Sequence, residues 1–285
     1  MKRRLCLQAG AGLAGLPAWA QDAPPRLISL NGSMTELLWR LGAQHLVVGT
    51  DTTSTYPAEA RLTPKVGYTR QLAAEGILSL RPTALLGTDE AGPPGVLAQL
   101  RQAGVPALLA RADHTVSELM AKIELTGRAS GQVLRAQALQ QDLTEQIAGV
   151  QALVARQAVV RRAREQAAPR VLFVMCHGGR PQSAGLGTAA HAMLALAGAT
   201  PAMQVHKGYQ ALSAEAVVQA CPELILTTED SIQASGGVSA FWRHPGLALT
   251  PAARHKRLVS MDAMALLGFG PRLPDMLKAL HEAVS

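Results

Sequence analysis

Aromatic side chains and long apolar runs are both scarce in this chain of 285 residues. Aromatic residues make up 3% of the sequence, so the core must be built from aliphatic side chains. No basic stripe is interleaved with aromatics, which argues against a nucleic-acid partner. No stretch approaches the ~20 consecutive apolar residues that a membrane-spanning helix needs. We therefore expect an aliphatic core and no transmembrane helix.

Cysteine is equally rare, with three in the whole chain. Cys176 ends one predicted strand, 171–175, whereas Cys221 precedes the next, 223–226. Neighbouring parallel strands would place the two sulfur atoms at opposite ends of the sheet, roughly 15 Å apart. We expect two free thiols in the mature protein.

Signatures of catalysis are missing as well. The run His177-Gly178-Gly179 is similar to an esterase oxyanion loop, but the chain has no Gly-x-Ser-x-Gly nucleophile elbow. The histidines are spread along the sequence and do not cluster as a site with several imidazole ligands requires, which argues against zinc capture. We expect a protein that is not an enzyme.

Residues 1–20 have the features of a signal peptide. Lys2, Arg3 and Arg4 precede a short apolar stretch rich in Gly and Ala, and Ala18-Trp19-Ala20 matches a cleavage site. Removal near Ala20 would take away three positive charges and lower the formal charge from +7 to +4. We expect an exported, unanchored protein whose mild positive excess suits an anionic ligand.

From Arg26 onward, short apolar strands alternate with helical patterns, which predicts parallel sheets covered on both faces. Between residues 116 and 166 the chain is rich in Ala, Leu, Gln, Glu and Arg and contains no proline. A helix over 132–166 would be about 50 Å long, enough to join two lobes. We predict an α/β fold with an N-terminal lobe over 21–113, a bridging helix over 114–168 and a C-terminal lobe over 169–285.

An internal repeat supports two similar lobes. Residues 74–82, ending in Arg81-Pro82, are answered 140 positions later by residues 214–222, ending in Cys221-Pro222. This correspondence makes Cys221-Pro222 a plain helix-to-strand connector, not a thiolate ligand. Ligands of parallel sheets bind beyond the carboxyl ends of the strands. Two such lobes facing each other predict a ligand cleft between them.

One segment of the first lobe carries specific chemistry. Tyr68 follows Gly67, and Arg70 stands two residues further on. In an extended or turn segment these two side chains would point roughly the same way, so the guanidinium could favour the phenolate. A phenolate suits ferric iron, and tyrosine is a known axial ligand of haem. The alternative is a surface turn with a packed tyrosine and a solvated arginine.

The continuation of that segment carries a family resemblance. Residues 67–82 resemble the signature of periplasmic haem-binding proteins of bacterial haem-uptake ABC importers, and further similarity extends from Arg26 to the C-terminus. Supporting elements are residues 29–36, 51–57 and 266–272. Within this class of Rossmann-like, two-lobed binders, residues 51–57 are also similar to siderophore and cobalamin binders. Those two ligands are therefore the nearest alternatives, and a periplasmic sensor or enzyme on the same scaffold is a more distant one.

The resemblance implies a role for each candidate residue. Tyr68 would ligate the haem iron and Arg70 would hold its phenolate. His177 would be a second ligand, a contact to a second haem, or a structural histidine. Arg272 is a candidate for pairing with a haem propionate. Tyr209 is a further haem-binding candidate and the rival to Tyr68, whose position it nearly repeats, but Ala211 replaces the arginine, so we expect it not to be the iron ligand.

The same resemblance implies partners and a location. The protein would act as a monomer in the periplasm and deliver haem to the permease dimer of an inner-membrane ABC importer with its ATPase. An outer-membrane haem receptor would act upstream. Glu75 and Glu215 hold equivalent places in the two repeats. They would contact the two permease subunits, unless they serve only to stabilise helix N-termini.

Overall fold

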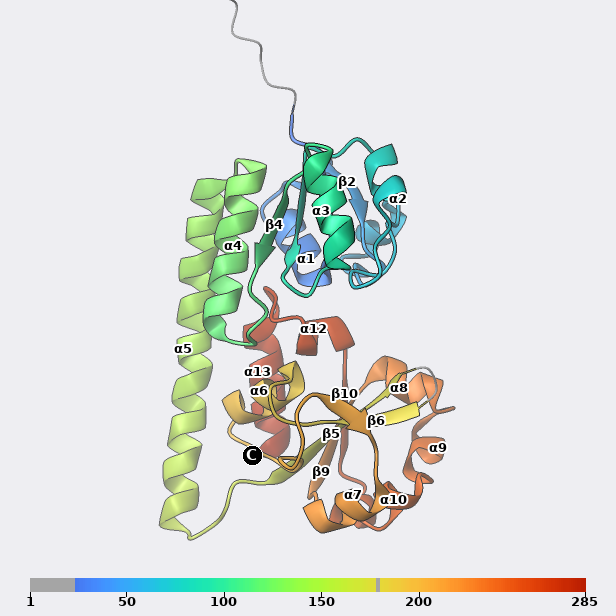
Figure 1. Ribbon diagram of the computed structural model, residues 1–285. Helices are drawn as coiled ribbons and strands as arrows, with labels where there is room; N and C mark the ends of the chain where they lie inside the picture. The colour runs from blue at the N-terminus through green and yellow to red at the C-terminus, as the bar shows by residue number, and fades with distance from the viewer. Residues whose placement is uncertain (1–23, 178–179) are drawn as a thin grey trace, which may run out of the picture.

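The computed structural model describes residues 24–177 and 180–285, except for the side chain of His177. It consists of two α/β lobes, one above the other, with a long helix along one flank (Figure 1). The predicted fold class is confirmed. The expected signal peptide lies outside the described residues. Across the described ranges, no helix combines the length and apolar character that crossing a membrane requires.

The first lobe is built on a four-stranded parallel sheet in the order β2-β1-β3-β4. Its strands are β1 (Leu27–Ser29), β2 (Val47–Thr50), β3 (Ala84–Thr88) and β4 (Ala107–Ala110). The helices that accompany it are α1 (Gly32–Arg40), α2 (Ala74–Ser79) and α3 (Pro94–Gln102), with short 3-10 turns at Gln44–Leu46 and Ala58–Leu62. The central strands β1 and β3 are buried throughout, because helices and loops cover both faces of a parallel sheet.

The second lobe has a six-stranded sheet, and it is mixed where we expected parallel strands only. The parallel part is β5 (Arg170–His177), β7 (Thr200–Pro201), β9 (Leu224–Thr228) and β10 (Leu258–Met261). The antiparallel extension is β6 (Arg180–Ala184) and β8 (Tyr209–Ala211).

Eight helices follow along the second lobe of the described chain. They are α6 (Ala189–Leu196), α7 (Ala214–Ala220), α8 (Glu229–Ala234), α9 (Val238–Trp242), α10 (Pro245–Ala248), α11 (Pro251–Arg254), α12 (Ala263–Leu267) and α13 (Leu273–Val284). The last of these, α13, packs against the bridging helix α5 (Val133–Ala163) and closes the lobe on that side (Figure 1).

The predicted bridge consists of two helices. Helix α4 (Val116–Ser130) ends at Gly131, which adopts a left-handed φ of 71°, and α5 (Val133–Ala163) then runs for 31 residues. At ~1.5 Å per residue α5 spans about 47 Å, close to the predicted length. Its buried positions include Leu139, Leu143 and Ile147. These side chains belong to one apolar core that reaches from β1 and β3 of the first lobe to β5 and β9 of the second.

The repeat of 140 positions holds in the structure. It relates the first residue of α2, Ala74, to that of α7, Ala214, and β3 to β9 at both ends. The connectors match in backbone conformation too, since Arg81 and Cys221 are both left-handed, with φ of 48° and 45°. Each directly precedes a proline. Cys221-Pro222 is therefore a connector, as predicted, and both Cys176 and Cys221 are free thiols.

Candidate functional site: the cleft between the lobes

The loop that carries Tyr68 is a tight turn held against the first sheet. Gly67 has a φ of 99°, a conformation that favours glycine, and its carbonyl accepts a hydrogen bond from the Thr52 amide at 3.0 Å. The Gln71 amide closes the turn by donating to the Tyr68 carbonyl at 2.8 Å. The Tyr68 side chain is 39% exposed, so its phenol is available to a ligand.

Two backbone hydrogen bonds join this loop to the turn that follows β3. The Gly92 amide donates to the Thr69 carbonyl, and the Leu72 amide donates to the Gly92 carbonyl, each at 2.9 Å. This double link brings Glu90 next to Arg70. The Arg70 Nη2 to Glu90 Oε1 distance is 2.5 Å.

Arg70 is thus paired with a carboxylate that sequence reasoning did not consider. Residues 68–71 form a closed turn, one of the two backbone geometries for which the i, i+2 spacing predicts that Tyr68 and Arg70 point the same way, so the contact between their side chains stays a prediction. Glu90 is 20 positions from Arg70 and lies in a different loop, so no local pattern in the sequence indicates the pair.

Tyr209 approaches the same region from the second lobe. It is 38% exposed, and its ring meets Phe173 edge-on with centroids 6.5 Å apart. Burial raises the pKa of Tyr209 to about 12, even though a hydrogen bond from the Ala190 backbone opposes the shift. The charges of Glu90 and Arg70 also act on this pKa, which places the Arg70–Glu90 pair opposite Tyr209. The Tyr68 loop therefore faces the second lobe.

His177 is the last residue of β5, and its backbone pairs with Arg180 of β6 across a tight hairpin. Its side chain, together with Gly178 and Gly179, lies outside the described residues. The expectation that His177 contacts the ligand therefore stays a prediction.

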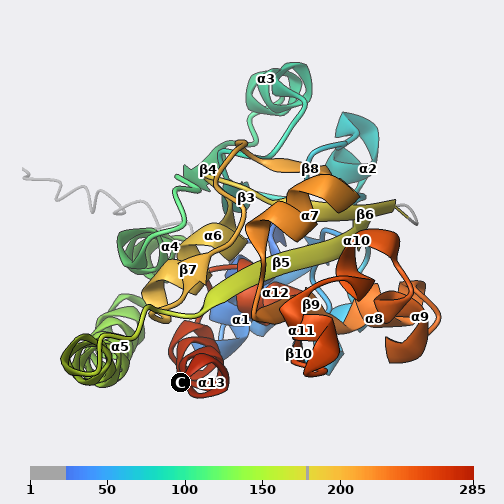
Figure 2. The same ribbon diagram turned by 90° about the horizontal axis from the view of Figure 1, so that it is seen from below.

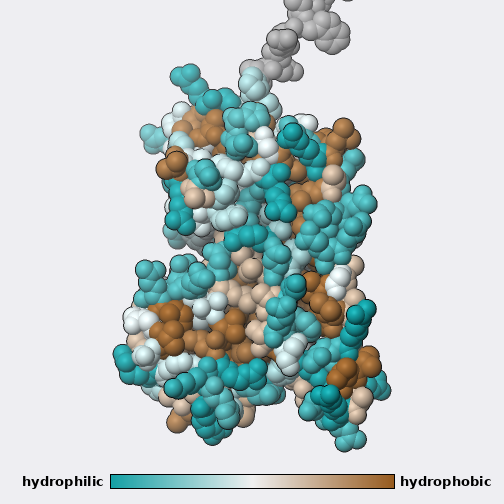
Figure 3. Space-filling model, turned by 180° about the vertical axis from the view of Figure 1, so that it is seen from behind, coloured by the Kyte–Doolittle hydropathy of each residue, from teal (hydrophilic) through white to brown (hydrophobic). Residues whose placement is uncertain are grey.

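Arg272, the predicted propionate partner, is engaged in a network between the lobes. Its Nε and Nη2 atoms bind the Glu36 carboxylate at 2.8 and 2.5 Å, and Nη1 lies 3.1 Å from Asp262 Oδ1. The guanidinium also stacks over the Tyr56 ring, 4.1 Å from the centroid. Glu36 lies in α1, the helix that follows β1, and Asp262 comes directly after β10. The carboxyl ends of the two sheets therefore face each other, as predicted. Figure 3 shows the waist between the lobes from behind, with apolar surface gathered on the lower lobe beneath it.

The segment 51–57 is structural in this protein. Asp51 is fully buried and accepts hydrogen bonds from the Thr53 amide, the Thr53 hydroxyl and the Ser54 hydroxyl at 3.1, 2.7 and 2.7 Å. Burial raises the pKa of Asp51, and these hydrogen bonds oppose the shift. The motif shapes the loop that carries Tyr56 to Arg272.

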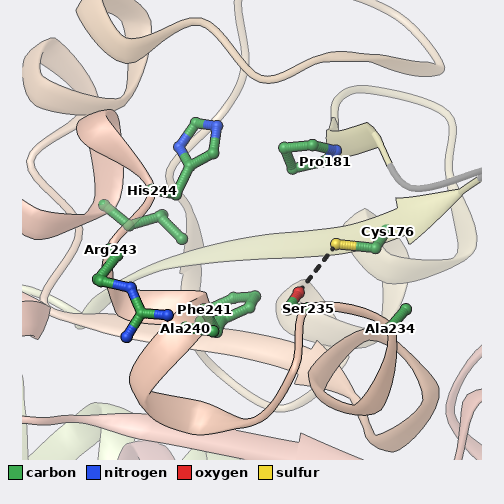
Figure 4. A pocket seen from close by; sticks show the side chains of 9 residues that line it. Cys176, Pro181, Ala234, Ser235, Ala240, Phe241, Arg243 and His244 are labelled. Atoms are coloured by element: carbon green, nitrogen blue, oxygen red, sulfur yellow. Dashed lines mark hydrogen bonds between the residues drawn. The ribbon is translucent and has the colours of Figure 1, made fainter.

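A cavity of about 240 Å³ lies in the second lobe beneath the β5–β6 hairpin (Figure 4). Cys176 is on its wall, with Sγ 3.3 Å from the Ser235 hydroxyl, and Phe241 and His244 line the opposite side. The volume is below the ~300–1,000 Å³ usual for small-molecule sites. We regard it as a side cavity of the second lobe, and the ligand site between the lobes stays a prediction from the sequence.

Glu75 and Glu215 both lie in the first turn of their helices, α2 and α7, and both are exposed. Figure 2 shows α2 at the upper right and α7 near the centre of the view, both apart from α5 at the lower left. The carboxylates are therefore accessible to a partner, one on each lobe.

Two lobes that face each other across the carboxyl ends of their sheets, joined by one long helix, define a class of substrate-binding proteins. The chain belongs to the periplasmic binding protein family, whose model matches residues 27–265.

Solved structures resemble it closely. The periplasmic heme-binding protein BhuT in complex with two hemes is 39% identical, with a TM-score of 0.83, and the match covers 92% of this chain and 98% of that one. The periplasmic heme-binding protein RhuT from Roseiflexus sp. RS-1 in apo form is 36% identical, with a TM-score of 0.84 and the same coverage. Among curated sequences, the uncharacterized ABC transporter substrate-binding lipoprotein YvrC of Bacillus subtilis is 26% identical over 92% of this chain and 80% of its own length.

Proposed function

We propose that this protein captures ferric haem between its lobes and delivers it to an inner-membrane ABC importer. The observation that carries the proposal is the exposed phenol of Tyr68, held on a loop that faces the second lobe. Tyr68 supplies the axial oxygen ligand to the iron, and the apolar surface of the lobes receives the porphyrin. The identity of 36–39% to haem-binding proteins over 92% of the chain supports haem over other ligands.

The proposal gives a role to three further residues. Arg70 stabilises the phenolate once iron is bound. His177 contacts the haem from the hairpin of the second lobe. Arg272 remains in its ion pairs with Glu36 and Asp262 and acts mainly to hold the lobes together, so its predicted contact to a propionate is secondary.

We infer the location, processing and partners of the protein from its family. Residues 1–20 are the export signal, removed near Ala20, and the N-terminal lobe, bridge and C-terminal lobe occupy 21–113, 114–168 and 169–285. The mature monomer works in the periplasm, downstream of an outer-membrane haem receptor. Glu75 and Glu215 contact the two subunits of the permease dimer. The protein binds and delivers its ligand and performs no chemistry on it.

A ligand titration tests the proposal. Hemin, a ferric siderophore and cobalamin are titrated separately into the mature protein, and binding is followed by absorption and by tryptophan fluorescence. We expect hemin to bind at least tenfold more tightly than the other two, with a high-spin ferric spectrum typical of tyrosinate ligation. Preferred binding of cobalamin or a siderophore would assign the protein to another branch of its family.

A further inference from the structure

The Arg70–Glu90 pair is built into the fold. The hydrogen bonds Gly92 amide to Thr69 carbonyl and Leu72 amide to Gly92 carbonyl fix the two loops against each other. On the other side, Asp89 Oδ1 accepts a hydrogen bond from the Ala112 amide at 2.9 Å, and the Asp89 amide donates to the Ala110 carbonyl. Glu90 is therefore presented to Arg70 by backbone contacts on both sides of its loop.

The pair also cancels charge where an anion would bind. Arg70 is the cation closest in sequence to Tyr68, and its Nη2 atom already donates to Glu90. In the described part of the chain, this is the hydrogen bond that the guanidinium makes. With Glu90 attached, Arg70 offers no net positive charge to a phenolate.

The pair is nevertheless easy to separate. The Arg70 and Glu90 side chains are 55% and 39% exposed, and ion pairs exposed to this degree contribute little to stability. A stronger acceptor arising beside Arg70 can therefore take the guanidinium from Glu90. Iron ligation creates such an acceptor, because it turns a neutral phenol into an anionic oxygen.

We infer that Glu90 is the resting counter-ion of Arg70, and that haem loading transfers the guanidinium from the Glu90 carboxylate to the Tyr68 phenolate. This inference rests on the proposed haem ligation by Tyr68. In this arrangement Glu90 acts against loading: part of the affinity for haem is spent on separating the ion pair. Glu90 is thus a positioning residue that lowers haem affinity and eases release at the importer.

A double-mutant cycle with hemin titration tests the exchange. Glu90→Gln keeps the shape of the side chain and removes its charge, and we expect it to tighten hemin binding about two- to fivefold, as the loss of a weak exposed pair allows. In an Arg70→Gln background the same change should leave hemin affinity unaltered. The tyrosinate spectrum should persist in Glu90→Gln, because the iron ligand is intact.

A matched control comes from another exposed pair. Glu124 and Arg128 form an ion pair on α4 with exposures of 53% and 72%, and Glu124→Gln removes the same charge far from the cleft. It should leave hemin affinity unchanged. If Glu124→Gln raised hemin affinity by the same factor, the effect of Glu90→Gln would come from net charge alone. If Glu90→Gln raised hemin affinity equally in the wild-type and Arg70→Gln backgrounds, Glu90 would not act through the guanidinium. Either result, or an unchanged or weakened affinity in Glu90→Gln, overturns the inference while wild-type haem binding stands. Failure of the wild-type protein to bind hemin would remove the proposed function and this inference with it.

Discussion

Arg272 and Glu36 are 236 positions apart in the sequence and form a bidentate ion pair that joins the two lobes. Glu36 is 5% exposed, and burial raises its pKa although Arg272 lowers it. A second link is near: the buried Lys122 of α4 pairs with Glu118 and donates to the Gly268 carbonyl at 2.9 Å. The lobes are thus connected by polar contacts as well as by the shared apolar core.

Arg272→Gln should destabilise the protein by about 2–4 kcal/mol, because it leaves the Glu36 carboxylate buried without its charge partner. Urea unfolding followed by circular dichroism measures this. The double variant Glu36→Gln/Arg272→Gln should recover part of the loss, since no charge is then buried alone. If both variants are as stable as the wild type, the Arg272–Glu36 pair contributes nothing to the free energy of unfolding.

Asp51 should make stability depend on pH in an unusual direction. Its folded-state pKa is raised above the ordinary value of 3.8, so the folded state binds a proton more readily than the unfolded state. The free energy of unfolding should therefore rise as pH falls from neutrality through the range just above 3.8, to the extent that Asp51 contributes. Comparing unfolding curves of wild type and Asp51→Asn over that range isolates this contribution. If the contribution of Asp51 to the free energy of unfolding fell as the pH was lowered, the pKa of Asp51 would not be raised in the folded state.

Tyr68 and Tyr209 should behave differently when each is changed to phenylalanine. Tyr68→Phe should abolish the tyrosinate charge-transfer bands of bound hemin and weaken binding by at least the ~10–100-fold that loss of a supporting group at a metal site costs. Tyr209→Phe should keep the bands, because Ala211 stands where Tyr68 has Arg70 to stabilise a phenolate, and burial raises the pKa of Tyr209 to about 12, above that of an ordinary phenol. If Tyr209→Phe lost the charge-transfer bands and Tyr68→Phe kept them, Tyr209 of the second lobe would be the iron ligand.

Much of this architecture could be predicted from the sequence because it depends on local pattern. The helices α2 and α7 with their connectors were predicted from a spacing of 140, strand β9 from a short apolar run, and a helix of about the length of α5 from its composition. The hairpin of β5 and β6 was missed: its first strand was predicted over 171–175, but β6 begins Arg180-Pro181, and a proline at that place usually indicates a loop.

The polar contacts of the site could not be predicted, for a different reason. Glu90 meets Arg70 only because two loops are linked through Thr69 and Gly92. Arg272 meets Glu36 only because the lobes face each other. Such pairs depend on tertiary distances, which a single sequence does not contain. Tyr68 was identified because its neighbours in sequence carry the signal.

Loading with haem should change the overall shape very little. Helix α5 is continuous across both lobes, and the core packed around it leaves no flexible hinge of the kind that wide domain closure uses. Small-angle scattering of the apo and hemin-loaded protein should give radii of gyration that differ by less than about 1 Å. A decrease of several ångströms on loading would show that the lobes close as separate bodies.

The two glutamates on α2 and α7 should matter for delivery and not for haem capture. Both carboxylates are exposed, at equivalent positions of the repeat, so a two-fold permease can meet each lobe with the same basic surface. Ion pairs at the rim of an interface act chiefly on orientation and association rate, so single changes should be mild. Glu75→Ala/Glu215→Ala should bind hemin normally yet reduce haem-dependent stimulation of the importer's ATPase, most strongly at low protein concentration and low salt.

The control must separate docking from helix stabilisation, because a carboxylate in a first helical turn also interacts favourably with the helix dipole. Glu59 and Glu229 are exposed and stand in first turns elsewhere on the two lobes. The double variant Glu59→Ala/Glu229→Ala loses the same two charges and the same type of interaction, and it should stimulate the ATPase as the wild type does. Equal stimulation by both double variants would mean that Glu75 and Glu215 only stabilise their helices. A deficit confined to Glu75→Ala/Glu215→Ala, with hemin affinity and thermal stability unchanged, would place the permease contact on this face of the molecule.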